Sequence, residues 1–96
     1  MKREASINLL NKAVADELQA VHQYLYFHIH LEDQGLRPLA EQFRKTAVEE
    51  MRHVAKLAER VLYLKGDVKM QSAGPVDTIK DPLAMLEKAR KMEEVS

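Results

Sequence analysis

The sequence predicts an all-α protein in which two long helices form an antiparallel hairpin and a short third helix follows. Alanine, leucine, glutamate and lysine dominate, whereas glycine and proline occur only three times each, a composition typical of helical proteins. Over two long stretches apolar residues recur at alternating steps of three and four, the spacing that places side chains on one helix face. Only a short turn separates these stretches, so the two helices should be antiparallel neighbours.

The first helix is predicted over residues 6–32. Its core stripe consists of Leu10, Val14, Glu17, Val21, Tyr24, His28 and Leu31. Glu17 therefore occupies a position where an apolar residue is expected. Further apolar residues flank the stripe on both sides, so this helix should be covered from two directions.

The second helix is predicted over residues 38–65. In the turn before it, Gly35 is free to adopt a positive φ, and Pro38 suits an early helical position. Gly66 supplies the C-terminal stop. The core stripe of this helix consists of Phe43, Ala47, Glu50, Val54, Leu57, Val61 and Leu64.

Residues 67–80 lose the helical periodicity and are predicted to form a long crossover loop. Asp81 then provides an N-cap and Pro82 a first helical residue for a third helix over residues 82–96. Two long helices and one short helix cannot enclose a four-helix core, so a second copy of the chain is expected to complete the bundle as a homodimer. The whole chain, residues 1–96, is thus interpreted as one half-bundle domain.

Composition excludes several classes of function. Fifteen basic residues balance fifteen acidic ones, so net charge gives no indication of a nucleic-acid partner. The absence of cysteine excludes disulfides and thiolate metal sites. No segment approaches the roughly 20 apolar residues that span a bilayer, and the N-terminal residues lack a signal-peptide core, so we expect no membrane association and a cytoplasmic location.

Glu50 and His53 are the sharpest functional signal in the sequence. Glu50 lies in the core stripe of the second helix, whereas the neighbouring Glu49 falls on its solvated face. A carboxylate in an apolar stripe must be paired, protonated or bound to a metal. His53 projects from the same side one turn later, and no other glutamate in the chain has a histidine three residues after it. With Glu17 on the adjacent helix, these donors suit iron, manganese or zinc.

The stretches LNKAVADELQAVHQY and VEEMRHVAKLAERVLYLKG closely resemble the first half of bacterioferritins and bacterioferritin-like proteins. This resemblance implies that Glu17 is a terminal iron ligand, Glu50 a carboxylate that bridges two irons, and His53 the imidazole ligand. It also implies that Tyr24 packs beside the di-iron centre. Glu93 falls where the family places its third-helix ligand, with Glu94 as the alternative.

The same resemblance places Met51 at the family's haem-ligating methionine. Met51 also shares a second apolar stripe with Val48, Ala55, Ala58 and Leu62, for which interface packing is the competing interpretation. Two departures from the family pattern stand out: a fourth helix with a second Glu/His pair is absent, and Lys45 replaces a histidine of an inner-surface iron site.

The sequence therefore predicts a ferroxidase that oxidises Fe(II) at a di-iron carboxylate site formed between subunits, in iron storage or detoxification. Glu17, Glu50, His53 and Tyr24 are its expected catalytic residues, and Glu93 is an additional metal ligand. One alternative is a non-catalytic helical assembly module with a structural Glu–His or zinc site. Another is a fragment of a full-length bacterioferritin-like protein, whose remaining helix would complete the site within one chain.

Overall fold

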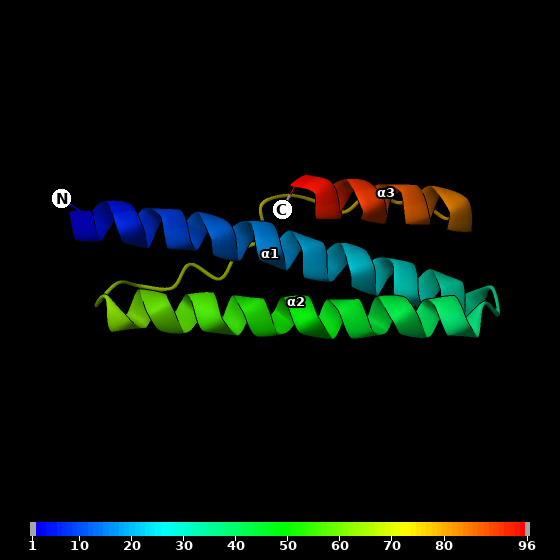
Figure 1. Cartoon of the computed structure of the whole chain (residues 1–96), viewed down its shortest axis with the longest axis horizontal. Helices are drawn as coiled ribbons and strands as arrows, with labels where there is room; N and C mark the ends of the chain where they lie inside the picture. The colour runs from blue at the N-terminus through cyan, green and yellow to red at the C-terminus, as the bar shows by residue number, and fades with distance from the viewer. Residues whose placement is uncertain (1, 96) are drawn as a thin grey trace.

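The computed structural model describes residues 2–95, and the side chains of residues 2–94. This part of the chain contains three helices and no strand: α1 (Lys2–Asp33), α2 (Arg37–Tyr63) and α3 (Pro82–Val95). The helices α1 and α2 run antiparallel along the long axis of the molecule, and α3 runs beside the C-terminal half of α1 (Figure 1). The all-α prediction and the order of two long helices and one short helix are confirmed.

The helix boundaries differ slightly from those predicted. The first helix begins at Lys2 rather than at Ser6, because Lys2 to Ala5 includes no helix breaker. The second runs from Arg37 to Tyr63, with Pro38 in its first turn as expected. In the third, the backbone N–H of Ala84 donates to the Asp81 carboxylate at 3.0 Å, which is the predicted N-cap.

The turn between α1 and α2 depends on Gly35, which has a φ of 80°. The N–H of Gly35 donates to the carbonyl of Glu32, and the N–H of Leu36 donates to that of Leu31 at 2.9 Å. This pair of bonds is the Schellman motif, which closes a helix with one left-handed residue. The predicted positive φ at Gly35 is confirmed, and the short turn makes the two helices antiparallel.

Glycine at position 66 has a different role from the helix stop that the sequence predicted. The left-handed residue after α2 is Lys65, with a φ of 64°, and the N–H of Gly66 donates to the carbonyl of Val61. A Cβ atom on Gly66 would lie 2.8 Å from Cδ1 of Ile7, closer than side-chain carbons approach one another. Glycine is therefore required at position 66 for the close approach of α1.

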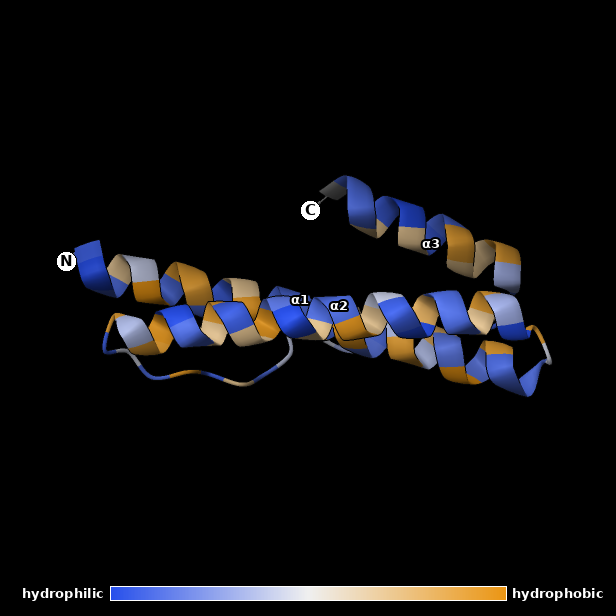
Figure 2. Cartoon of the chain, turned by 60° about the horizontal axis from the view of Figure 1, so that its bottom comes forward, coloured by the Kyte–Doolittle hydropathy of each residue, from blue (hydrophilic) through white to orange (hydrophobic). Residues whose placement is uncertain are grey.

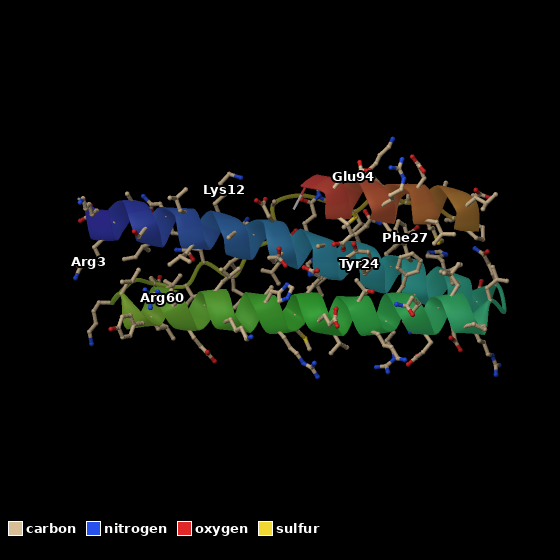
Figure 3. The ribbon with its side chains drawn as sticks, viewed as in Figure 1. Arg3, Lys12, Tyr24, Phe27, Arg60 and Glu94 are labelled. Carbon is tan, nitrogen blue, oxygen red and sulfur yellow. The ribbon has the colours of Figure 1, made fainter. Side chains whose placement is uncertain are left out.

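The core lies along the seam between α1 and α2 and extends under α3. Within it, the rings of Phe27 and Phe43 meet edge to face at 5.4 Å, and the ring of Tyr24 stacks on that of Phe43 at 5.9 Å. Met85 of α3 is fully buried against this cluster. Figure 3 shows Tyr24 and Phe27 on the part of α1 that lies beside α3. The predicted core stripe of α2 is confirmed at Phe43, Ala47, Val54 and Val61, all of which are buried.

Hydrophobic and hydrophilic residues alternate around each helix, so the helices are amphipathic rather than uniformly apolar (Figure 2). Within residues 2–95, none of the helices combines the length and the apolarity that crossing a membrane requires.

The crossover between α2 and α3 lies in extended form along α1. Three amide side chains of α1 bond to its backbone: Asn11 at Asp67 and Lys69, Gln19 at Pro75, and Gln23 at Asp77. Gln34, in the turn after α1, bonds to Lys80 in the same way. The N–H of Ala73 also donates to the carbonyl of Ala15 at 3.0 Å. The crossover thus covers the side of α1 that α2 and α3 leave open, in agreement with the prediction of cover from two directions.

Candidate metal centre

The helical hairpin brings Glu17, Glu50 and His53 together. The Nδ1 atom of His53 lies 3.3 Å from Oε2 of Glu17 and 3.5 Å from Oε2 of Glu50. One ligand atom from each of the three residues lies within 4.8 Å of the other two. Two carboxylates and an imidazole at these separations can converge on one cation or flank a pair.

The antiparallel register explains this convergence. Glu17 lies on the stripe of α1 that faces α2, Glu50 lies on the matching stripe of α2, and His53 follows one turn later. The two carboxylates are partly buried, with side-chain exposures of 25% for Glu17 and 15% for Glu50, whereas His53 is 56% exposed. The cluster is therefore anchored in the core and open on the His53 side.

The pKa of the Glu50 carboxyl is raised to about 7, mainly because the carboxyl is buried. A hydrogen bond with the Glu17 carboxyl and the charges of Glu17 and Glu93 contribute to this rise, while the charge of His53 opposes it. Desolvation and like charges both disfavour the ionised form of a carboxyl. A bound cation would reverse this electrostatic situation, because it neutralises the charges that now repel one another.

Tyr24 links the third helix to the cluster. Its ring is buried, and its hydroxyl donates a 2.7 Å hydrogen bond to Oε1 of Glu93. Burial, this hydrogen bond and the nearby charges of Glu93, Glu50 and Glu17 all raise the pKa of the Tyr24 phenol. Of the two glutamates considered from sequence, Glu93 lies at the cluster, whereas the Glu94 carboxylate pairs with Arg90 on the exposed side of α3.

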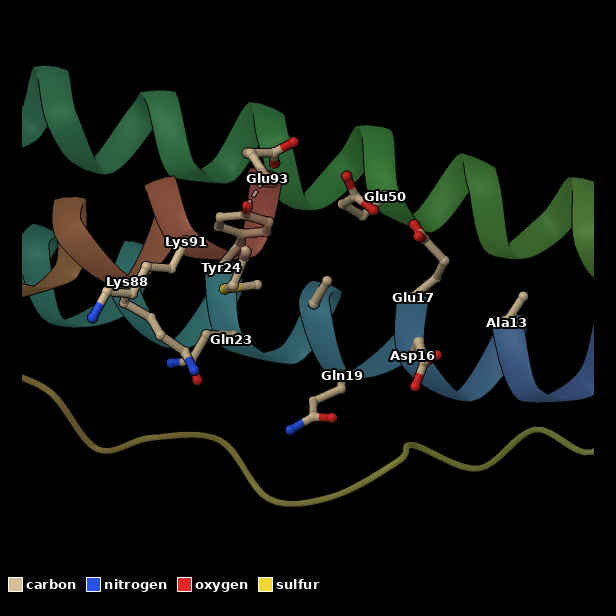
Figure 4. Close-up of a pocket in the computed structure, with 12 residues that line it drawn as sticks. Ala13, Asp16, Glu17, Gln19, Gln23, Tyr24, Glu50, Lys88, Lys91 and Glu93 are labelled. Carbon is tan, nitrogen blue, oxygen red and sulfur yellow. Dashed lines mark hydrogen bonds between the residues drawn. The ribbon is translucent and has the colours of Figure 1, made fainter. Parts of the chain in front are cut away.

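These side chains border an open cavity of about 600 Å³ between α1, α2 and α3. Figure 4 shows Glu17 and Glu50 opposite one another on the two long helices and Glu93 above the Tyr24 hydroxyl. Lys88 and Lys91 of α3 border the same cavity, as does the amide of Gln23. The sequence analysis did not identify these three residues as part of the site. Gln23 could have been found, because Asn11, Gln19 and Gln23 are amides spaced by multiples of four and therefore form a polar row along α1.

Met51 lies outside this cavity. Its side chain is 54% exposed on α2, and Val48, Ala55, Ala58 and Leu62 of the same stripe are exposed or half-buried. Residues 50 and 51 are separated by about 100° around a helix, so Met51 points away from the direction in which Glu50 meets Glu17. The structure thus separates the Met51 stripe from the carboxylate cluster.

Taken together, the fold and the cluster define a class of protein: a helical bundle that places carboxylate and imidazole donors between its long helices. A model of the ferritin-like domain matches residues 7–95. The chain belongs to the ferritin-like family.

Its relatives include bacterioferritins. The chain is 43% identical over 72 residues to the bacterioferritin of Desulfovibrio desulfuricans, covering 75% of this chain and 40% of that protein. It is 38% identical over 89 residues to the bacterioferritin of Rhodobacter capsulatus, covering 91% of this chain and 55% of the relative. The chain therefore spans about half the length of the curated relatives it matches.

Solved structures of the same two proteins superpose on the chain. The D. desulfuricans bacterioferritin, whose structure describes a di-iron site in different catalytic states, matches with a TM-score of 0.93 at 35% identity, covering 97% of this chain and 54% of that one. The R. capsulatus bacterioferritin, described with a metal-free dinuclear site and a haem iron, matches with a TM-score of 0.89 at 33% identity, covering 95% and 57%. The hairpin and the short third helix thus adopt the bacterioferritin fold.

Proposed function

We propose that this chain binds Fe(II) and supports its oxidation at a dinuclear carboxylate site, in iron storage or detoxification. The observation that carries the proposal is the convergence of Glu17, Glu50 and His53, whose ligand atoms lie within 4.8 Å of one another beside an open cavity. The relatives named for a di-iron or dinuclear site share this fold at 33–35% identity.

In this proposal Glu17 would supply a terminal carboxylate and His53 an imidazole nitrogen to the iron, and the Glu50 carboxylate would be shared by the two ions. Carboxylates favour the harder Fe(III) over Fe(II), which lowers the cost of oxidation. Two Fe(II) ions give up one electron each, and the pair of electrons with two protons reduces dioxygen to hydrogen peroxide, or peroxide to water. Tyr24 fixes the Glu93 carboxylate at the cavity by its hydrogen bond and so orients a further oxygen donor.

One chain supplies only part of a dinuclear ligand set, so the remaining donors must come from a second helical pair. We propose that a second copy of the chain provides them, which makes the site a product of homodimerisation. The alternative is that the equivalent helices belong to the same, longer polypeptide, as the coverage of 40–55% of the relatives would allow. Mass in solution and the number of irons per chain distinguish the two arrangements.

When Fe(II) is added to the metal-free protein in air, the ferric absorbance should develop faster than in buffer. Glu50→Ala should reduce this rate to nearly that of buffer, because it removes the carboxylate between the two irons. Glu49→Ala, which alters an exposed carboxylate one residue away, is the matched control and should behave like the wild type. An unchanged rate in Glu50→Ala would reject the assignment in favour of a structural Glu–His or zinc site.

We also propose that the Met51 stripe binds haem between two copies of the chain, one thioether from each. This proposal is supported by the exposure of Met51 and by the haem iron described for the R. capsulatus relative. Reconstitution with haem should give a visible spectrum with bis-thioether features in the wild type. Those features should disappear in Met51→Leu, which keeps the volume but removes the sulfur; their persistence would leave interface packing as the role of Met51.

A further inference from the structure

Gln23 is a buried amide that borders the same cavity as Glu17, Glu50 and Glu93. Its side chain is 3% exposed, although it lies on the side of α1 turned away from the α1–α2 seam. Nε2 of Gln23 donates to the carbonyl of Asp77 at 3.0 Å, and Oε1 accepts from the N–H of the same residue at 2.8 Å. A buried amide needs such partners, and here a single crossover residue supplies both.

Asp77 also contacts the third helix. Its carboxylate lies 2.9 Å from Nζ of Lys88 in α3. Gln23, Asp77 and Lys88 therefore connect α1, the crossover and α3 in one line of polar contacts. This ion pair is only partly shielded from water, so its effect is to align the helix more than to stabilise the fold.

The neighbouring residue, Tyr24, holds α3 at a second point. Its hydroxyl bonds to Glu93, which follows Lys88 by five residues, or about 7.5 Å along a helix. Two adjacent residues of α1 thus fix two successive turns of α3, one through the crossover and one directly. Figure 4 shows Gln23, Lys88 and Glu93 along the wall of the same cavity.

We propose that Gln23 is a positioning residue for the metal centre: by fixing Asp77 it sets the place of Lys88 and of α3, and so keeps the Glu93 carboxylate at the Tyr24 hydroxyl. This inference rests on the proposed function, in which Glu93 faces the bound iron. The side-chain amide of Gln23 is hydrogen-bonded to the backbone of Asp77. Its influence is exerted through the position of α3.

The test uses Gln23→Met, which keeps the length of the side chain and removes its amide. In the metal-free protein, hydrogen exchange should accelerate at the Asp77 amide and along residues 85–93, and the NMR signal of the Tyr24 hydroxyl proton should shift. Affinity for Fe(II), measured without oxygen, should fall about tenfold, as expected for groups that orient metal ligands. Gln19→Met is the matched control, because Gln19 bonds to the crossover at Pro75, whereas Lys88 of α3 pairs with Asp77.

A second variant keeps the test decisive if Gln23→Met does not fold. Lys88→Met removes the ion pair with Asp77 from a partly exposed site, and it should produce the same changes to a smaller degree. Unchanged exchange in α3 and an unchanged Tyr24 signal in both variants would overturn the proposal, as would altered signals with wild-type Fe(II) affinity. If the wild type bound no iron, the proposed function would fail, while the metal-free signals would still decide whether Gln23 positions Glu93.

Discussion

Phe27→Ala should remove most of the stability of this chain. Phe27 is fully buried where the two long helices meet beneath α3, and its ring packs edge to face on Phe43 at 5.4 Å. Truncating a buried phenylalanine costs about 3–5 kcal/mol, because apolar surface is lost and a cavity remains. A small domain has only about 5 kcal/mol or slightly more to lose. The loss is measured by urea unfolding followed by helical circular dichroism.

Leu83→Ala is the matched control for this experiment. Leu83 is an apolar residue of α3 that is 76% exposed, so its truncation should change the free energy of unfolding by less than about 0.5 kcal/mol. A Phe27→Ala variant that lost no more stability than Leu83→Ala would show that the core does not depend on the contact between Phe27 and Phe43.

The metal-free wild type should become less stable relative to Glu50→Gln as pH rises from about 4.5 to above 7. The folded state raises the pKa of Glu50 to about 7, so between these limits the folded chain holds a proton that the unfolded chain releases. Stability from this group is complete below the unfolded pKa and is lost as pH rises through the folded one. A pKa shift from 4.5 to about 7 corresponds to a difference on the order of 3 kcal/mol. Urea unfolding of both proteins across this pH range measures it.

Glu49→Gln provides the comparison on the solvated face of the same helix. It should follow the pH dependence of the wild type. Parallel curves for the wild type and Glu50→Gln would mean that Glu50 is not desolvated as the structure indicates. Fe(II) should reverse the trend in the wild type, because binding requires the ionised carboxylate and stabilises the folded state in proportion to its affinity.

Much of this architecture is present in the periodicity of the sequence. The stripe through Phe43, Ala47, Val54 and Val61 identifies the buried face of α2, and the same spacing places Glu50 within it. The same three- and four-residue spacing places Glu17 on the core stripe of α1, so it also predicts that Glu17 and Glu50 face each other. Local pattern is sufficient wherever one helix face decides both burial and chemistry.

Features that depend on tertiary contacts could not be predicted from the sequence. The distinction between Glu93 and Glu94 depends on how α3 is rotated on α1, which is set by Met85, Tyr24 and the crossover. The need for glycine at position 66 comes from Ile7, 59 positions earlier in the chain, and no local rule contains that contact. The path of residues 67–80 could not be predicted either. An extended segment has no periodicity that indicates its position, and here the position is fixed by hydrogen bonds to amide side chains far away in the sequence.

The crossover has almost no slack. Between the levels of Asn11 and Gln34, α1 rises about 35 Å, and the segment from Lys69 to Lys80 that follows it can reach at most about 40 Å when fully stretched. Chain length alone therefore limits how far α3 can slide towards the turn between the long helices. Two residues fewer would leave the tether too short, whereas extra residues could bulge outward, so this connection can lengthen freely but can hardly shrink.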